Sequence, residues 1–206
     1  MTRDDFVRAI VIGVRTQMDT KYPVSSDKVG AIREEAETLA DGLEGMIDDV
    51  PFSEVFVGMV HKLGHVPKGE RLALFKQEAQ NVSDAISAPP PKVRGTALPQ
   101  LDPEQEEFRR DVARDILIRV RAGMDPRYGV TKERAIVMMR DAEQMADEFM
   151  ARELDTETRE VVVGMCAHVG SIVQSAKLSN FIEQAKIVSA VLHTPRKPPS
   201  STAARR

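Results

Sequence analysis

Two histidines, His61 and His65, have the spacing in this chain that most resembles a reactive pair. Four residues apart on a helix, their imidazoles would share one face and could bind a metal ion. A zinc protease of this pattern places glutamate directly after the first histidine as general base, whereas Lys62 stands here. No third ligand is evident in the sequence, and a solvated polar helix end is the favoured interpretation. We therefore predict neither a metal nor a cofactor.

A second candidate is a polar segment that occurs twice, at 14–25 and 120–131, as Val-Arg-x-x-Met-Asp-x-(Lys/Arg)-Tyr-x-Val-(Ser/Thr). Its arginine, aspartate and tyrosine could form a duplicated binding site. They contain no acid–base or nucleophile pair, however, and they equally suit a corner between two helices. There the aspartate would bond backbone amides and the arginine stem would cover apolar surface. The residues concerned are Arg15, Asp19, Tyr22, Arg121, Asp125 and Tyr128.

Motifs of covalent and phosphate chemistry are missing from the sequence. It contains no glycine-rich phosphate loop, no nucleophile elbow and no Cys-x-x-Cys pair, and its single cysteine, Cys166, occupies an apolar position of a predicted helix. We expect no enzymatic activity. The rival hypothesis is a metal- or small-ligand-binding enzyme or sensor, built on His61, His65 and the corner that contains Asp19 and Asp125.

The recurring segment belongs to a longer internal duplication. A shift of 106 residues aligns 6–89 with 112–195 without a gap, and 26 of 84 positions are identical. A duplication of this length means that the fold is built from repeats. Residues kept in both copies indicate the shared architecture. The two histidines align with Ala167 and Ser171, so they are not part of it.

The spacing of apolar residues predicts four helices in each copy. Apolar side chains recur every three or four residues, which lays one buried stripe along a helix. The fold class is therefore all-α, with two tandem four-helix repeats. The predicted helices cover 6–18, 29–46, 55–63 and 72–86, and then 112–124, 135–149, 161–169 and 178–192.

Local signals mark the ends of these helices. Capping side chains precede the second and third helix of each copy, and Asp102-Pro103 precedes the first helix of the second copy. Mid-helix glycines at 58 and 164 predict close helix–helix approach, because glycine there costs about 1 kcal/mol relative to alanine. Glycines 64 and 170 suit helix C-termini. The capping residues are Ser25, Thr131, Asp49 and Asp155.

Proline and charge divide the chain into four segments. We expect a helical repeat at 1–88, a Pro-rich linker at 89–101, a second repeat at 102–194 and a disordered basic tail at 195–206. Whether the repeats form one fused body or two independent bundles stays open, although surplus apolar residues in the second copy favour fusion. These are Ile136, Val137, Met139, Met150, Ile182, Ile187 and Val191.

Charge and hydropathy exclude several classes of protein. The net charge of −3 is uneven, because 6–89 carries −4, 112–195 carries −1 and 196–206 carries +4. A nucleic-acid-binding domain would show clustered basic residues on its body. The tail residues Arg196, Lys197, Arg205 and Arg206 could at most contact a polyanion weakly. No apolar stretch approaches the roughly 20 residues of a membrane span, and no signal peptide is evident, so a cytoplasmic protein is expected.

These observations favour a non-enzymatic helical protein-interaction module, such as an adaptor, a chaperone-like protein or an assembly factor, that holds a partner helix or peptide. Abundant methionine suits adaptable apolar surfaces, although core filling explains it equally well. Arg8 and Arg114 could bind an acidic partner or bridge acids such as Glu37/Glu143 or Asp41/Asp147. Self-association is the alternative to a foreign partner. The apolar candidates for contact are Met139, Met150, Ile182 and Ile187.

Overall fold

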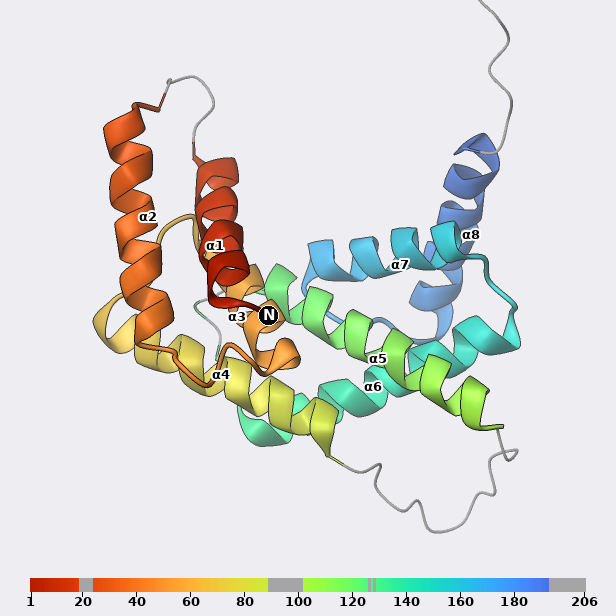
Figure 1. Ribbon diagram of the computed structural model, residues 1–206. Helices are drawn as coiled ribbons and strands as arrows, with labels where there is room; N and C mark the ends of the chain where they lie inside the picture. The colour runs from red at the N-terminus through yellow and green to blue at the C-terminus, as the bar shows by residue number, and fades with distance from the viewer. Residues whose placement is uncertain (19–23, 89–101, 126, 128, 193–206) are drawn as a thin grey trace, which may run out of the picture.

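The computed structural model describes residues 1–18, 24–88, 102–125, 127 and 129–192. These residues form eight helices and no strand, so the predicted all-α fold is confirmed (Figure 1). The predicted linker at 89–101 and tail at 195–206 lie outside the described residues, as does the middle of the first corner. The helices are α1 (Arg3–Gln17), α2 (Ser26–Asp41), α3 (Val50–Leu63), α4 (Gly69–Ser87), α5 (Pro103–Gly123), α6 (Lys132–Ala151), α7 (Thr156–Val169) and α8 (Ser175–Leu192).

The helix starts agree with the duplication seen in the sequence. The second, third and fourth helices of the two repeats begin 106 residues apart, as α3 and α7 do at Val50 and Thr156. The predicted caps are confirmed, because each capping side chain accepts a hydrogen bond from a backbone N–H of the first turn. Asp102 and Gln105 form a reciprocal capping box at the start of α5. Local sequence therefore sets these boundaries.

The repeats differ at the end of their second helix. The prediction of a helix up to residue 46 is wrong in the first repeat, where α2 ends at Asp41 and turns follow. Gly45 in those turns has φ +81°, a left-handed conformation that favours glycine. Its counterpart 106 residues later, Ala151, is the last residue of the longer α6. The glycine thus accompanies an early end of the helix.

Each repeat is held together in the same way. Its first helix packs on its second and third, and its third packs on its fourth. An ion pair joins the first helix to the second in both, through Arg3 and Asp41 at 2.6 Å and through Arg109 and Asp147 at 2.5 Å. The core of the first repeat contains four phenylalanines, whose rings contact one another at centroid distances near 6 Å: Phe6, Phe52, Phe56 and Phe75.

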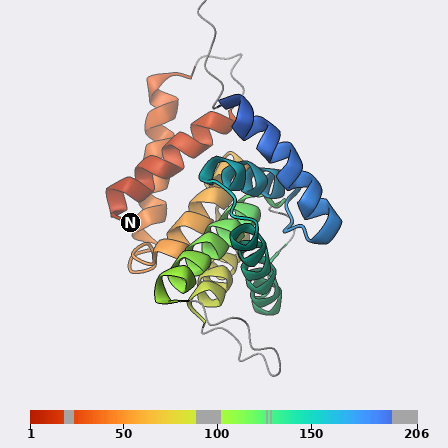
Figure 2. The same ribbon diagram turned by 90° about the vertical axis from the view of Figure 1, so that its right-hand side faces the viewer.

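The two repeats pack directly on each other. Helices α3 and α4 of the first repeat lie against α5 and α6 of the second, and the buried apolar side chains of both repeats form one cluster. We call this contact of four helices the junction. It leaves α1 and α2 at one end of the molecule and α7 and α8 at the other (Figure 1). Viewed from the second end, α8 crosses the front of the molecule (Figure 2).

Candidate functional sites

The two histidines singled out in the sequence have different surroundings. His61 is half-buried, and its Nε2 lies 2.9 Å from the carbonyl oxygen of Ala9, a geometry for donation to the α1 backbone. The ring occupies the space above Gly13, where a Cβ would overlap it. His65 is exposed. No group of three or more histidine, cysteine or acidic residues able to hold a metal occurs among the described residues. His61 therefore has a packing role between α1 and α3.

The structure does not describe residues 19–23 of the first corner, so only the second corner can be followed. There Tyr128 is also outside the described residues. Asp125 accepts a hydrogen bond from the backbone N–H of Arg127 at 2.9 Å and pairs with the guanidinium of the same residue. The bonds from Arg127 lower the pKa of Asp125 from 3.8 to about 2. The aspartate thus bonds a backbone amide, as predicted for a structural corner.

Cys166 is a buried core residue, as its alignment with Val60 predicts. Burial raises the pKa of its thiol above the ordinary value. Because only the thiolate is nucleophilic, burial makes this thiol less reactive than an exposed one.

A buried ion pair in the junction was not predicted from the sequence. Arg121 on α5 is fully buried and bonds Glu78 on α4, whose side chain is 6% exposed. Beside this pair, the side chain of Asn81 donates to the backbone oxygen of Val130 at 2.8 Å. Burying two charges costs several kcal/mol per ion, which close pairing must offset. An acid among apolar positions of the fourth helix was the only signal for this pair, and its partner lies in the other repeat.

The mid-helix glycines have different surroundings. At Gly58 on α3, a Cβ would stand 2.5 Å from the Cβ of Ala122 on α5, so the predicted close approach is confirmed there. At Gly164 on α7 the prediction fails among the described residues, because outside the neighbouring residues and backbone of its own helix no atom lies within 4 Å of that Cβ position. Equivalent glycines thus allow close helix packing in the first repeat and lie exposed in the second.

The predicted partner-binding residues fall into two groups. Ile187 is 67% exposed, Arg8 is exposed and Met150 is half-buried. Ile182 and Met139, at 0% and 9% exposure, are core residues and offer little surface to a partner. The tail residues predicted to contact a polyanion lie outside the described residues.

Arg114 bridges an acid on a neighbouring helix, as predicted, but the acid is not one of those named from the sequence, and exposed Arg8 forms no ion pair with a described residue. Arg114 reaches across the junction to Glu54 at 3.1 Å, because the acids of the second helix already pair with an arginine one turn earlier on the first helix. Arg3 takes Asp41, and Arg109 takes Asp147.

A surface groove occurs at equivalent places in both repeats, between the second helix and the segment that leads into the fourth. The first groove has a volume of about 500 Å³ and the second about 400 Å³. Seven lining positions of one coincide with seven of the other after the shift of 106 residues. These pairs are Thr38/Gln144, Leu39/Met145, Gly42/Glu148, Pro67/Val173, Lys68/Gln174, Gly69/Ser175 and Leu72/Leu178.

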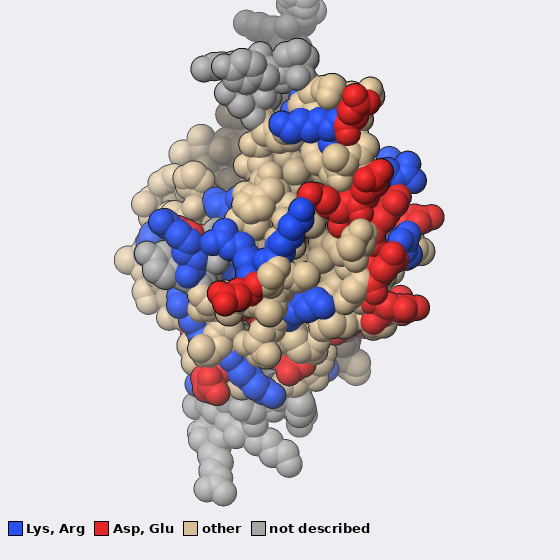
Figure 3. Space-filling model, turned by 90° about the vertical axis from the view of Figure 1, so that its left-hand side faces the viewer, with Lys and Arg blue, Asp and Glu red and all other residues tan. Residues whose placement is uncertain are grey.

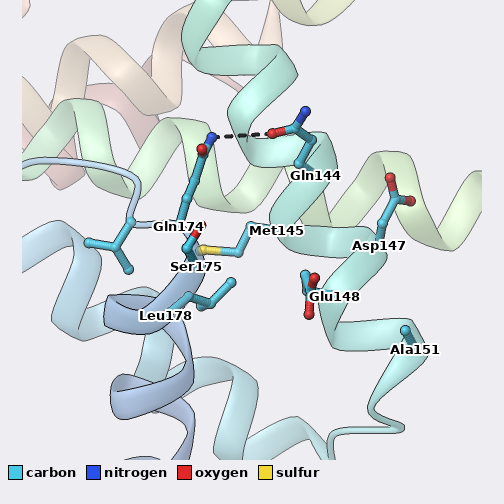
Figure 4. A pocket seen from close by; sticks show the side chains of 9 residues that line it. Gln144, Met145, Asp147, Glu148, Ala151, Gln174, Ser175 and Leu178 are labelled. Atoms are coloured by element: carbon cyan, nitrogen blue, oxygen red, sulfur yellow. Dashed lines mark hydrogen bonds between the residues drawn. The ribbon is translucent and has the colours of Figure 1, made fainter.

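The grooves have an apolar floor and a polar rim. In the second groove Met145 and Leu178 line the bottom, and Gln174 donates to Gln144 at 3.2 Å across one end (Figure 4). In the first groove Lys68 pairs with Glu35 at 2.6 Å across the rim. Such a combination suits an amphipathic ligand, because apolar floor and polar rim contact different sides of it.

The charged side chains of the groove linings are mostly acidic. Two carboxylates and one lysine line the first groove, and two carboxylates line the second, which gives formal sums of −1 and −2. On the face of the molecule that α2 presents, acidic side chains gather along one edge (Figure 3). The lining acids are Glu34, Glu35, Asp147 and Glu148.

Comparison with family models, with curated proteins and with solved structures gives no match to this chain. Within the described residues, none of the helices is both long enough and apolar enough to cross a membrane.

Proposed function

We propose that this protein is a non-enzymatic interaction module that holds amphipathic helices or peptides of partner proteins in its two grooves. The observation that carries the proposal is the recurrence of one groove at equivalent positions of both repeats. The shared helix arrangement already places a hollow at this point in both repeats, but it does not require an apolar floor, and Leu39 and Leu72 in the first groove match Met145 and Leu178 in the second. A binding function would retain this floor.

The chemistry of the grooves indicates the kind of partner. Apolar floors that include Leu72 and Leu178 suit leucine- or methionine-sized side chains spaced along one face of a helix. Three of the four lining acids already pair with Lys68, Arg109 and Arg152, so the charge of the rims adds only a modest preference for lysine or arginine beside those anchors. The described part of the chain offers no metal cluster and a buried, less reactive cysteine, so a binding role needs the fewest further assumptions.

The test uses a synthetic helical peptide with leucine on one face and lysine on the other, titrated into the full-length chain. We expect saturable binding with two sites per chain. Ala31 and Ala151 line the two grooves, and both are exposed. Ala31→Arg and Ala151→Arg should each remove one site, by filling the groove and opposing the lysines.

Matched controls separate groove binding from general attraction. Ala73→Arg adds the same charge at an exposed position of α4 outside both linings and should leave two sites. A peptide with glutamate in place of lysine should bind weakly. Unsaturable binding, or two sites retained in both groove variants, would rule the proposal out.

A further inference from the structure

The outer surface of α7 and α8 is apolar, and no described residue covers it. On α8 the side chains of Ile187, Val191 and Leu192 are 67%, 68% and 65% exposed. Large apolar side chains gathered in this way on a soluble chain mark an interaction site. We call this surface the open face. It comprises Val161, Gly164 and Met165 on α7 and Ile187, Val188, Val191 and Leu192 on α8.

The corresponding surface of the first repeat is the one buried in the junction. Val188 on α8 is 44% exposed, whereas its counterpart Val82 on α4 is fully buried. Val191 takes the place of Ala85, which is 5% exposed in the junction. Terminal repeats of stacked-repeat proteins usually carry a polar outer face that keeps them soluble. Here the terminal face is more apolar than the internal one, which is the pattern of a face that receives a partner.

The opposite end of the molecule exposes the surface that would fit it. In the junction, α3 and α4 are covered by α5 and α6, whose counterparts in the first repeat are α1 and α2. Ile12 on α1 is 51% exposed and Val29 on α2 is 37% exposed. Their counterparts are covered, since Ile118 packs against the core and Ala135 is fully buried. The helices that carry these surfaces, α1 and α2 on one side and α7 and α8 on the other, lie at opposite ends of the molecule (Figure 1).

We propose that the open face binds a second copy of this chain, whose α1 and α2 take the place that α5 and α6 take in the junction. The contact is head-to-tail, with different surfaces on the two copies, and it lies apart from the grooves. Arg114 and Glu54, 3.1 Å apart in the junction, correspond to Arg8 on one copy and Glu160 on the other, both exposed. Thr16 of the second copy would lie against Gly164.

One substitution makes this contact weaker than the junction. Gln184 stands at the counterpart position of Glu78, so Arg15 of the second copy would meet an amide oxygen instead of a carboxylate. Burying the Arg15 guanidinium against a neutral amide costs more free energy than burying it against a carboxylate. The exposed apolar side chains of the open face still favour association. The self-association is therefore reversible and depends on concentration.

Sedimentation velocity of the full-length chain from about 1 µM to about 500 µM tests the proposal. We expect the mean mass to rise with concentration in the unmodified chain. It should stay at one chain in Val191→Glu and in Ile12→Glu, which place a charge on the open face and on α1. Val137→Glu, at an exposed position of α6 outside both surfaces, should associate like the unmodified chain. Circular dichroism checks that each variant is folded.

Mixing the two blocked variants distinguishes a head-to-tail contact from a symmetric one. Each variant keeps one intact surface, so an equimolar mixture should form a dimer of one chain of each and nothing larger. No dimer in the mixture, a monomeric unmodified chain, or association that persists in Val191→Glu would overturn the proposal. So would self-association that begins only after residues 193–206 are deleted, because the chain's own tail would then be the occupant.

Discussion

The inner face of the first repeat and the outer face of the second are built from equivalent positions of the same two helices. In the junction most of these positions are buried. Glu78 pairs with Arg121, Asn81 donates to a backbone oxygen, and Gly58 admits a neighbouring helix. On the open face Gln184 and Ile187 stand in place of Glu78 and Asn81. The valine and the glycine are kept, as Val188 and Gly164. The two repeats thus share the shape of this contact surface but differ in its polarity.

The largest difference should come from the buried charge. Glu78→Ala leaves Arg121 buried without its partner, which typically costs about 3–5 kcal/mol of unfolding free energy. The counterpart change on the open face, Gln184→Ala, affects an exposed side chain and should stay within about 0.5 kcal/mol. Urea unfolding of both variants measures the difference. A loss below about 1 kcal/mol in Glu78→Ala would show that the pair does not hold the junction.

The two glycines should respond with opposite signs. Gly58→Ala puts a Cβ against Ala122 and forces α3 and α5 apart, an overpacking that costs about 1–3 kcal/mol. Gly164→Ala meets no described atom and should add up to about 1 kcal/mol of helix stability in the monomer. Thermal unfolding in dilute solution measures both. The same Gly164→Ala should weaken self-association at high concentration, and equal shifts for the two variants would contradict the comparison.

Caps that both repeats share should give similar effects, slightly larger for Asp155 because it also accepts a hydrogen bond from the Thr158 hydroxyl. Asp49 and Asp155 cap the third helices and also accept from the equivalent serines, Ser83 and Ser189. Replacing either aspartate by alanine should lower the Tm by about 2–4 °C. If one variant lost about 2–4 °C and the other lost far more or nothing, the interiors of the two repeats would not be equivalent.

One of these caps also makes stability depend on pH. Hydrogen bonds from Thr158 lower the pKa of Asp155 below its ordinary value of 3.8. The stabilisation is therefore present above pH 3.8 and is lost as the pH falls through the lower folded pKa. Asp155→Ala should flatten the acid side of the Tm profile.

The sequence predicted features that depend on neighbours along the chain. Helices, caps and the C-terminal glycines follow from spacing and from first-turn chemistry, which a duplicated sequence displays twice. The spacing of residues did not predict which apolar side chains are buried. Val82 and Val188 are the same residue at equivalent positions of the pattern, yet 0% and 44% exposed, because what covers a position lies elsewhere in the chain. The pairing of Arg121 with Glu78 and the grooves escaped prediction for the same reason.

An engineered disulfide tests most directly whether the open face binds α1 and α2 of a second copy as the junction surface of the first repeat binds α5 and α6. In the junction a Cβ on Gly58 would lie 2.5 Å from the Cβ of Ala122. Bonded cysteines need Cβ atoms about 3.8 Å apart, so the two copies must sit about 1 Å further apart at this point for the bond to form. Chains with Thr16→Cys and chains with Gly164→Cys, both in a Cys166→Val background, would be mixed and oxidised mildly.

We predict a cross-linked dimer with one chain of each kind, well above the yield for Thr16→Cys mixed with the exposed Val137→Cys. A yield no higher than that control, or a dimer formed mainly by Gly164→Cys with itself, would contradict the head-to-tail account.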